Sequence, residues 1–182
     1  MDDIQLNIVQ LEDVEALQRI AKKTFYETFA ESNSETNMAS YLDTGFSIAK
    51  LQQELKNNQT IFYFAVFRNI VIGYLKVNLG AAQTEVQDHD GLEIERIYVT
   101  REFHGKEVGK LLYEKAYEIA KQKDVSYMWL GVWEENLRAI NFYKKCGFVE
   151  FDKHIFKLGD DEQTDIMMKL KLDEAATLSK SV

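Results

Sequence analysis

The segment between residues 92 and 109, LEIERIYVTREFHGKEVG, constrains the fold of this chain more than any other. Its first half alternates like a β-strand, and its second half holds a glycine-bearing turn from which a helical pattern begins. The free backbone N–H groups and the positive dipole end at the start of such a helix can hold a phosphate group. Glu93 and Glu95 lie just upstream. The segment therefore predicts an anionic cofactor beside an acid/base group.

Hydrophobic periodicity predicts the remaining elements of the fold. Strands are expected at residues 4–9, 61–67, 70–79, 92–99, 127–133, 148–157 and 164–172. Helices are expected at residues 11–29, 48–55, 107–123 and 136–147, with the polar residues 31–37 separating the first two. The order β-α-α-β-β-β-α-β-α-β-β predicts a single-domain α/β fold, in which helices cover both faces of a mixed central sheet of about seven strands.

The length and the composition of the chain are typical of one soluble domain. The chain has 182 residues, of which 46% are hydrophobic, so it can bury a substantial core. We expect the domain to cover residues 1–172 and residues 173–182 to form a flexible tail. No apolar run approaches the ~20 residues that cross a bilayer, and the first residues lack a signal-peptide pattern. A cytoplasmic protein without a membrane partner is expected.

Charge and residue types narrow the classes of partner. The net charge of −8 argues against a nucleic-acid surface and would suit a cationic substrate, although acidity alone is common among soluble proteins. Asp88, His89 and Asp90 are adjacent in a polar loop, a spacing that rarely builds a metal site, so no metal is expected. The single cysteine, Cys146, excludes an internal disulfide.

Two familiar phosphate-binding motifs do not fit the turn at residues 104–110, HGKEVGK. A dinucleotide fingerprint needs G-x-G-x-x-G, whereas only Gly105 and Gly109 are present, four apart. A P-loop needs four residues between its glycines and a Ser or Thr after its lysine. Here three residues separate the glycines, and Leu111 follows the lysine.

The same turn resembles the acyl-CoA-binding signature Q/R-x-x-G-x-G/A of the GCN5-related N-acetyltransferases (GNAT). His104 stands in the Gln/Arg place, Glu107 at the first glycine and Gly109 at the last. The preceding IERIYV is similar to the LERLYV-type strand of the family. Residues 135–148, ENLRAINFYKKCGF, resemble its later signature of an asparagine, an alanine, a Phe-Tyr pair and Gly-Phe. The resemblance covers roughly residues 4–172, with the three motifs in the family's order.

The resemblance implies acetyl-CoA as cosubstrate and a set of residues that bind it. These are Ile97, Tyr98, Val99, His104, Gly105, Lys106, Glu107, Val108, Gly109, Lys110, Asn136, Ala139 and Tyr143. A glutamate at residue 107 adds negative charge beside the pyrophosphate, so we expect weakened but not lost CoA binding. Glycine is unnecessary at that position unless the turn demands a positive φ.

Transfer of an acetyl group to an amine needs a base, because an alkylammonium with pKa ~10.4 has no free lone pair near neutral pH. Strand alternation predicts that Glu93, Glu95, Ile97 and Val99 share one face, so that both acids border one cleft. In the family a glutamate on this strand often serves as base, and a bulge opens the sheet for the pantetheine arm, which Ile97 and Val99 would bind. Either glutamate fits the role, and a solvated face paired with lysines is the alternative.

Further roles follow from the family resemblance. Tyr143 matches the tyrosine that protonates the departing thiolate in many members; a phenol with pKa ~10 still holds its proton at neutral pH. The junction between the first two helices forms the acceptor wall in the family, which makes Tyr26, Glu27 and Glu31 candidate substrate-binding residues. Members often form homodimers, which leaves that assembly open here.

The acceptor is predicted from a narrower resemblance. The segments TFYETF, FSIAKLQQEL and IERIYV look similar to bacterial polyamine (spermidine/spermine) acetyltransferases. The expected function is therefore direct transfer of acetyl from acetyl-CoA to a primary amine. A polyamine such as spermidine or spermine is the first acceptor to test. A peptide N-terminus or another small amine is the alternative acceptor. A CoA-sensing module without turnover is the alternative from another class, because His104 and Glu107 depart from the signature.

Overall fold

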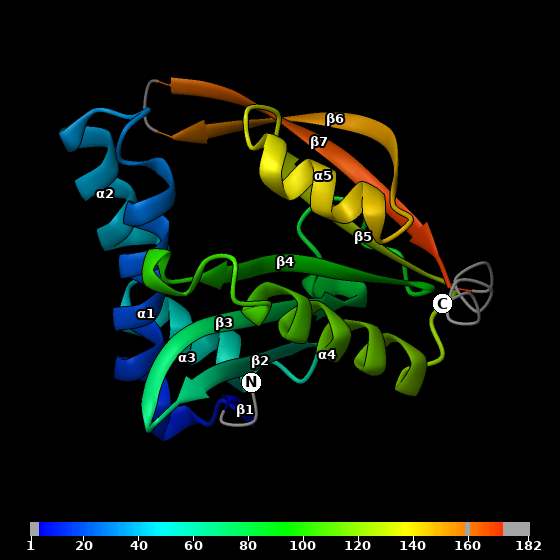
Figure 1. The fold of residues 1–182 in the computed structure, drawn as a ribbon, viewed down its shortest axis with the longest axis horizontal. Coiled ribbons are helices and arrows are strands. Elements are labelled where there is room, and N and C mark those ends of the chain that lie inside the picture. Colours follow the sequence, from blue (N-terminus) through cyan, green and yellow to red (C-terminus); the bar gives the residue numbers. More distant parts are fainter. Residues whose placement is uncertain (1–3, 159–160, 173–182) are drawn as a thin grey trace.

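Seven strands form one mixed sheet in the order β1-β2-β3-β4-β5-β7-β6 (Figure 1). They are β1 (Ile4–Ile8), β2 (Thr60–Phe67), β3 (Ile70–Leu79), β4 (Gly91–Val99), β5 (Tyr127–Trp133), β6 (Val149–Leu158) and β7 (Asp161–Lys171). All neighbouring strands pair antiparallel except β4 and β5, which run parallel. The computed structural model describes residues 4–158 and 161–172, and the predicted tail at residues 173–182 lies outside them.

Helices cover both faces of the sheet, which confirms the predicted fold class. They are α1 (Val14–Phe29), α2 (Glu35–Gly45), α3 (Ile48–Lys56), α4 (Val108–Gln122) and α5 (Leu137–Lys145). The first three pack on one face and the last two on the other (Figure 1). Short 3-10 turns occupy Leu11–Asp13, Gly80–Ala82 and Arg101–Phe103.

Helix α2 corrects the sequence analysis, which expected no helix between residues 29 and 48. Ser34 caps it, because its hydroxyl oxygen accepts a hydrogen bond from the Asn37 amide at 3.2 Å. Its only buried residues are Met38 and Gly45, so it has almost no apolar stripe. Without that stripe the helical period is not visible in the sequence.

Two apolar layers hold the helices on the sheet. Helices α4 and α5 pack against the residues of one face, and the buried members include Leu75, Ile94, Leu112, Ala116, Met128 and Ile140. Helices α1 to α3 pack against the other face, and the buried members include Leu17, Phe25, Met38, Leu51, Phe62 and Tyr74. Burial of this apolar area provides the main stabilisation of the fold.

The sheet opens between β4 and β5. Their parallel pairing covers only Gly91–Glu93 and Tyr127–Trp129, and the strands diverge beyond that point. In the same region β4 carries a bulge: Val77 pairs with Ile94 and Lys76 with Arg96, which leaves Glu95 without a partner on β3. The divergence creates the space in which the candidate site lies.

The bulge also corrects the predicted strand face. Glu93, Arg96 and Tyr98 face helices α1 to α3, whereas Ile97 and Val99 pack with the α4/α5 layer. Simple alternation placed Glu93, Glu95, Ile97 and Val99 together. One extra residue in β4 reverses the alternation after Glu95, because the side-chain period of a strand is two residues.

Candidate active site

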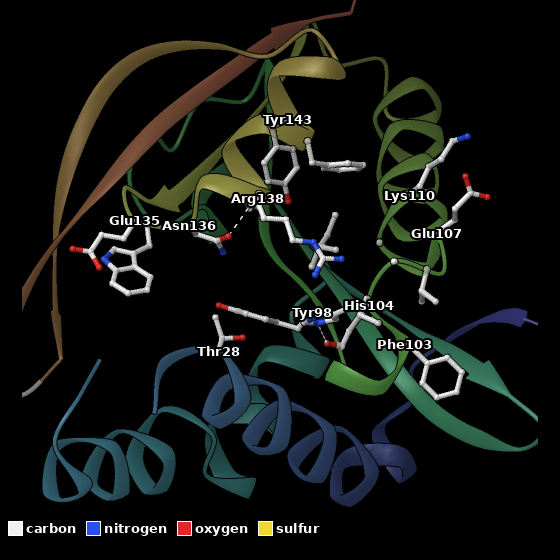
Figure 2. Close-up of a pocket in the computed structure, with 18 residues that line it drawn as sticks. Thr28, Tyr98, Phe103, His104, Glu107, Lys110, Glu135, Asn136, Arg138 and Tyr143 are labelled. Atoms are coloured by element: carbon white, nitrogen blue, oxygen red, sulfur yellow. Dashed lines mark hydrogen bonds between the residues drawn. The ribbon is translucent and has the colours of Figure 1, made fainter. Parts of the chain in front are cut away.

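A cavity of about 660 Å³ lies between β4, the following turn, α4 and α5 (Figure 2). Nearly all of the predicted cofactor-binding residues line it: Ile97, Tyr98, Val99, His104, Gly105, Glu107, Val108, Gly109, Lys110, Asn136, Ala139 and Tyr143. Lys106 does not line the cavity; its Nζ lies 4.7 Å from the ring centroid of Phe103. The structure therefore brings the two sequence signatures to one cavity.

The turn before α4 has the geometry of an anion-binding corner. Its backbone reaches α4 through Glu107, whose φ of 59° lies in the left-handed region. The position that matches the first glycine of the signature therefore does require a positive φ, and Glu107 adopts it at a steric cost that glycine avoids. The first backbone N–H groups of α4 have no partner within the helix and are open to an anion.

Side chains complete this corner. Nε2 of His104 lies 2.8 Å from the carbonyl oxygen of Val99; because a carbonyl only accepts, Nε2 carries the hydrogen. Lys110 and Arg138 are both among the lining residues; the Arg138 guanidinium reaches into the middle of the cavity, whereas the Lys110 ammonium group points outward from α4 (Figure 2). Glu107 also borders the cavity, but its side chain is exposed and its carboxylate points away from Arg138 and Tyr143 (Figure 2). The backbone N–H groups of the turn and the Arg138 cation fit a phosphate-bearing cofactor, and Glu107 adds an unfavourable negative charge nearby.

Tyr143 lies on the buried side of α5 and points into the same space (Figure 2). Asn136 fixes the start of that helix, since its Oδ1 accepts a hydrogen bond from the Ala139 amide at 3.1 Å. The rings of Phe142 and Phe148 pack 5.2 and 5.5 Å from the Tyr143 ring. Burial raises the pKa of Tyr143 well above its ordinary value, so the phenol holds its proton at neutral pH and has one to donate.

A second cavity, of about 370 Å³, lies on the opposite face of the sheet beneath α1 and α2. Six residues line both cavities: Ile97, Tyr98, Trp133, Asn136, Ala139 and Tyr143. The two spaces therefore meet where β4 and β5 diverge, and Tyr143 stands at the junction. A cofactor entering from one face and an acceptor entering from the other would meet at its hydroxyl.

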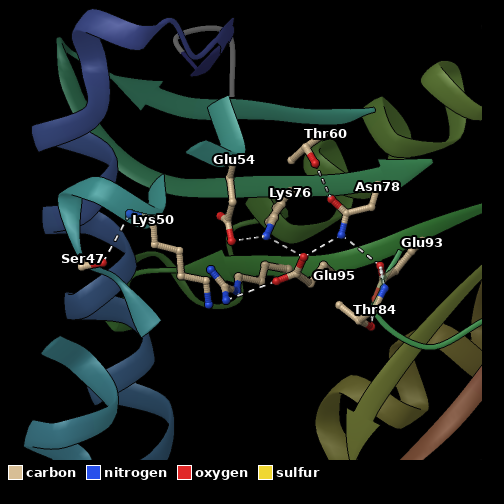
Figure 3. Close-up of polar contacts among 10 residues, drawn as sticks. Ser47, Lys50, Glu54, Thr60, Lys76, Asn78, Thr84, Glu93 and Glu95 are labelled. Carbon is tan, nitrogen blue, oxygen red and sulfur yellow. Dashed lines mark hydrogen bonds and ion pairs between the residues drawn. The ribbon is translucent and has the colours of Figure 1, made fainter. Parts of the chain in front are cut away.

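Glu93 and Glu95 both line the second cavity, yet their surroundings differ (Figure 3). Only 3% of Glu93 is exposed, and burial raises the pKa of its carboxyl above the usual range although hydrogen bonds from Thr84 and Asn78 oppose the shift. Burial would also raise the pKa of Glu95, but the charges of Arg96 and Lys76 outweigh it and lower the pKa to about 2. Glu93 is therefore the more basic of the two carboxylates.

Two ion pairs and one hydrogen bond hold the Glu95 carboxylate. Its Oε2 lies 2.6 Å from Lys76 Nζ and accepts a hydrogen bond from Asn78 Nδ2 at 2.6 Å. Its Oε1 lies 3.2 Å from Arg96 Nη2. A carboxylate held in this way is a structural anion and not an available base.

The comparisons with known proteins agree with this geometry. A family model described as the acetyltransferase (GNAT) family matches residues 14–148. The chain belongs to the GNAT family. Members of this family are acetyl-CoA-dependent N-acetyltransferases, which places this enzyme among the acyltransferases.

Relatives of this GNAT enzyme span nearly the whole chain. An uncharacterized N-acetyltransferase in the pepI 3′ region of Lactobacillus delbrueckii subsp. lactis is 40% identical over 172 residues, covering 94% of this chain and 99% of its own length. The spermidine N(1)-acetyltransferase of Thermoplasma acidophilum is 26% identical and covers 93% and 98%. A crystal structure of PaiA N-acetyltransferase from Thermoplasma acidophilum in complex with coenzyme A superimposes with a TM-score of 0.76 at 27% identity, covering 92% of this chain and 98% of that one.

The three residues that were predicted to bind the acceptor in this GNAT enzyme lie outside both cavities. Tyr26, Glu27 and Glu31 line neither cavity, and Tyr26 is exposed. Arg101 holds the two acids: its amide donates to Glu27 Oε2 at 2.8 Å, and its Nη2 lies 3.5 Å from Glu31 Oε1. These contacts fasten the end of α1 to the turn after β4. The α1 side chains that do line the second cavity are Phe25 and Phe29.

Several residues that line or support the second cavity of this GNAT enzyme were not predicted from the sequence. Asp165 lines the second cavity from β7, and burial raises the pKa of its carboxyl to about 6. Glu85 and His154 lie near it, with 3.2 Å between His154 Nε2 and Glu85 Oε1. Thr84 holds Glu93. They come from loops and distant strands, so no local pattern in the sequence signals them.

Within residues 4–158 and 161–172, no three His, Cys, Asp or Glu side chains are placed to hold a metal ion. In the same part of the chain, no helix is long and apolar enough to cross a membrane.

Proposed function

We propose that this GNAT enzyme transfers acetyl from acetyl-CoA directly to a primary amine of a polyamine such as spermidine or spermine. The observation that carries the proposal is the lining of the second cavity. Four carboxyl residues, Glu85, Glu93, Glu95 and Asp165, line it together with aromatic side chains that include Phe29, Trp133 and Phe156. Carboxylates and aromatic faces both attract ammonium groups, and a polyamine carries several. The similarity to a spermidine N(1)-acetyltransferase supports the same acceptor.

Acetyl-CoA supplies the acetyl thioester for this reaction. On the α4/α5 face the open N–H groups of Val108, Gly109 and Lys110 and the cation of Arg138 would hold its phosphates. The divergence of β4 and β5 leaves room for a narrow group to reach Tyr143. The remaining chemistry belongs to two side chains, one on each side of the junction.

Glu93 is proposed as the base. The amine enters as an ammonium group, and one N–H bond breaks as the proton moves to the Glu93 carboxylate, directly or through water. The freed lone pair forms the new N–C bond as the C–S bond breaks. Tyr143 then gives its phenolic proton to the leaving sulfur, whose thiol has pKa ~8.5. The acylated nitrogen gives up its second proton through water, which returns a proton to Tyr143 and leaves the neutral amide. Glu95 stays ionised and paired throughout.

A thiol-release assay tests this function. Spermidine, spermine, a peptide N-terminus and a simple monoamine are offered with acetyl-CoA to the wild type, Glu93→Gln and Tyr143→Phe. We expect turnover to be fastest with the polyamines and to fall at least a hundredfold in both variants. Faster turnover of the peptide would replace the polyamine as acceptor. Binding of CoA without turnover of any amine would support the sensing alternative. A cytoplasmic enzyme without a nucleic-acid partner remains part of the proposal.

A further inference from the structure

Thr84 holds both oxygens of the Glu93 carboxylate (Figure 3). Its hydroxyl donates a hydrogen bond of 2.5 Å to Oε1, and its backbone N–H donates one of 2.9 Å to Oε2. A third donor, Nδ2 of Asn78, lies 2.9 Å from Oε2. The plane of the carboxylate is therefore fixed by one loop residue and one residue of β3.

The two oxygens differ in what their partners do when a proton arrives. A backbone amide and a side-chain NH₂ group only donate, so a proton on Oε2 would point at hydrogens of Thr84 and Asn78. A hydroxyl can donate or accept, so a proton on Oε1 is accommodated when the Thr84 hydroxyl turns and accepts. The orientation of the Asn78 amide is itself fixed, because its nitrogen faces the carboxylates of both Glu93 and Glu95.

Thr84 also links this buried carboxylate to water. Glu93 is buried, whereas Thr84 lies in an exposed part of the loop between β3 and β4. The neighbouring Gln83 is buried and anchors the loop: its Nε2 donates to the Asp88 carbonyl at 2.6 Å, and its Oε1 accepts from Trp129 Nε1 at 2.6 Å. The Thr84 hydroxyl is thus held in place on a residue that solvent reaches.

We infer that Thr84 is a positioning residue for acetyl transfer, whose hydroxyl makes Oε1 of Glu93 the oxygen that takes the amine proton and provides the route by which that proton leaves. The step balances. The ammonium N–H bond breaks and an O–H bond forms on Oε1. The Thr84 hydroxyl then accepts that proton while its own hydrogen passes to water, and Glu93 returns to its carboxylate form. The inference rests on the proposed role of Glu93.

The pH dependence of the rate tests the role of Thr84, and the other charged groups around the cavity also affect that dependence. The charged side chains that line the same cavity from the surrounding elements are Lys50, Glu85, Glu95, Arg96, His154 and Asp165. Asp165 has a pKa of about 6 and titrates in the relevant range. A change at Thr84 leaves all six in place, so a difference between variant and wild type belongs to Glu93.

The test compares kcat/KM for spermidine against pH in the wild type, Thr84→Val and Thr84→Ser. Valine keeps the shape and the backbone N–H but removes the hydroxyl. We expect Thr84→Val to move the acid limb up by about one to two pH units, because a hydrogen bond to the ionised form is lost. We also expect kcat to fall about tenfold with KM for acetyl-CoA unchanged, and Thr84→Ser to restore both. Thr44→Val, which removes an exposed hydroxyl bonded to the Ser40 carbonyl on α2, is the matched control and should match the wild type.

The outcomes separate this inference from the proposed function. An acid limb that stays in place in Thr84→Val, while Glu93→Gln abolishes turnover, overturns the role of Thr84 and leaves Glu93 as base. Full turnover in Glu93→Gln overturns the assignment of the base itself. A fall in kcat that serine does not restore, with no shift of the limb, shows that Thr84 serves only the shape of the loop and also overturns the inference.

Discussion

Nζ of Lys76 lies 2.6 Å from Oε2 of Glu95 in a region where the two side chains are only 4% and 15% exposed. Glu54 of α3 binds the same ammonium group at 3.0 Å. Glu95 is the extra residue of the β4 bulge, so the ion pair fixes the side chain that the strand ladder leaves without a partner. This pair explains why the pKa values of two glutamates two residues apart shift in opposite directions. One is bound to cations and holds the bulge, and the other remains basic.

The Lys76–Glu95 pair should contribute to stability in a pH-dependent manner. The pKa of Glu95 is lowered from 4.5 to about 2 in the folded chain, so its contribution is present above the unfolded pKa and is lost as pH falls from there through about 2. Glu95→Gln leaves buried cations without this partner and should lower the free energy of unfolding by about 3 kcal/mol at pH 7. Urea unfolding at pH 7 and pH 3 measures it, and the variant should differ less from the wild type at pH 3.

A surface pair provides the control for this measurement. Glu150→Gln breaks the exposed pair between Lys144 and Glu150 and should leave the unfolding free energy nearly unchanged. A similar loss in Glu150→Gln and Glu95→Gln would contradict a special role for the buried pair. So would a loss in Glu95→Gln that is as large at pH 3 as at pH 7.

Most of the fold could be predicted from the sequence because its strands and four of its five helices have recognisable hydrophobic periods. Helix α2 could not, since Met38 is its only large buried side chain. The cofactor side of the site follows a linear motif, and the residues of that motif meet in one cavity because a strand, a turn and a helix are consecutive in the chain.

The acceptor side depends on contacts that no local pattern contains. The bulge that separates the faces of Glu93 and Ile97 is stabilised by Lys76 from another strand. The end of α1 was predicted to present Glu27, but Arg101 binds that acid, and the phase of the helix turns Phe29 to the cavity instead. Asp165 comes from β7, about seventy residues after Glu93, and only the sheet order β4-β5-β7 brings it to the same cavity.

Tyr143→Phe should reduce catalysis without affecting binding. The hydroxyl is the one group of this ring that can give a proton at the junction of the two cavities, and general acid catalysis contributes about 10²–10⁴-fold. We expect kcat to fall by that factor while the dissociation constant of CoA, measured by calorimetry, stays within about twofold. Tyr117→Phe on α4, outside both cavities, should retain the wild-type rate. Equal kcat values in Tyr143→Phe and the wild type would remove Tyr143 from the mechanism.

Glu107 combines a positive φ with an unfavourable charge, and two substitutions separate these effects. Glu107→Gln removes the charge but keeps the strained backbone, so CoA should bind about three- to tenfold tighter with unchanged stability. Glu107→Gly should bind CoA at least as tightly and also raise the unfolding free energy by about 0.5 kcal/mol, because glycine adopts this φ without steric cost. Calorimetric titration and urea unfolding measure the two effects. Glu118→Gln, farther along α4, should change neither, and an unchanged CoA affinity in both Glu107 variants would contradict the proposed clash with the phosphates.

Asp165 should determine the preference for an acceptor with more than one ammonium group. Its half-buried carboxyl lines the second cavity with a pKa of about 6, so it is anionic above that pH and neutral below it. Alkylammonium groups stay charged throughout this range, so the KM for spermidine should rise as pH falls through about 6. Asp165→Asn should raise the KM for spermidine about tenfold at pH 7.5, remove this pH dependence, and leave the KM for butylamine unchanged, because a monoamine has no second ammonium group to bind there. Asp152→Asn on the exposed edge strand β6 is the matched control. An equal rise in KM for both amines would show that Asp165 serves the general shape or charge of the cavity and does not recognise the second nitrogen.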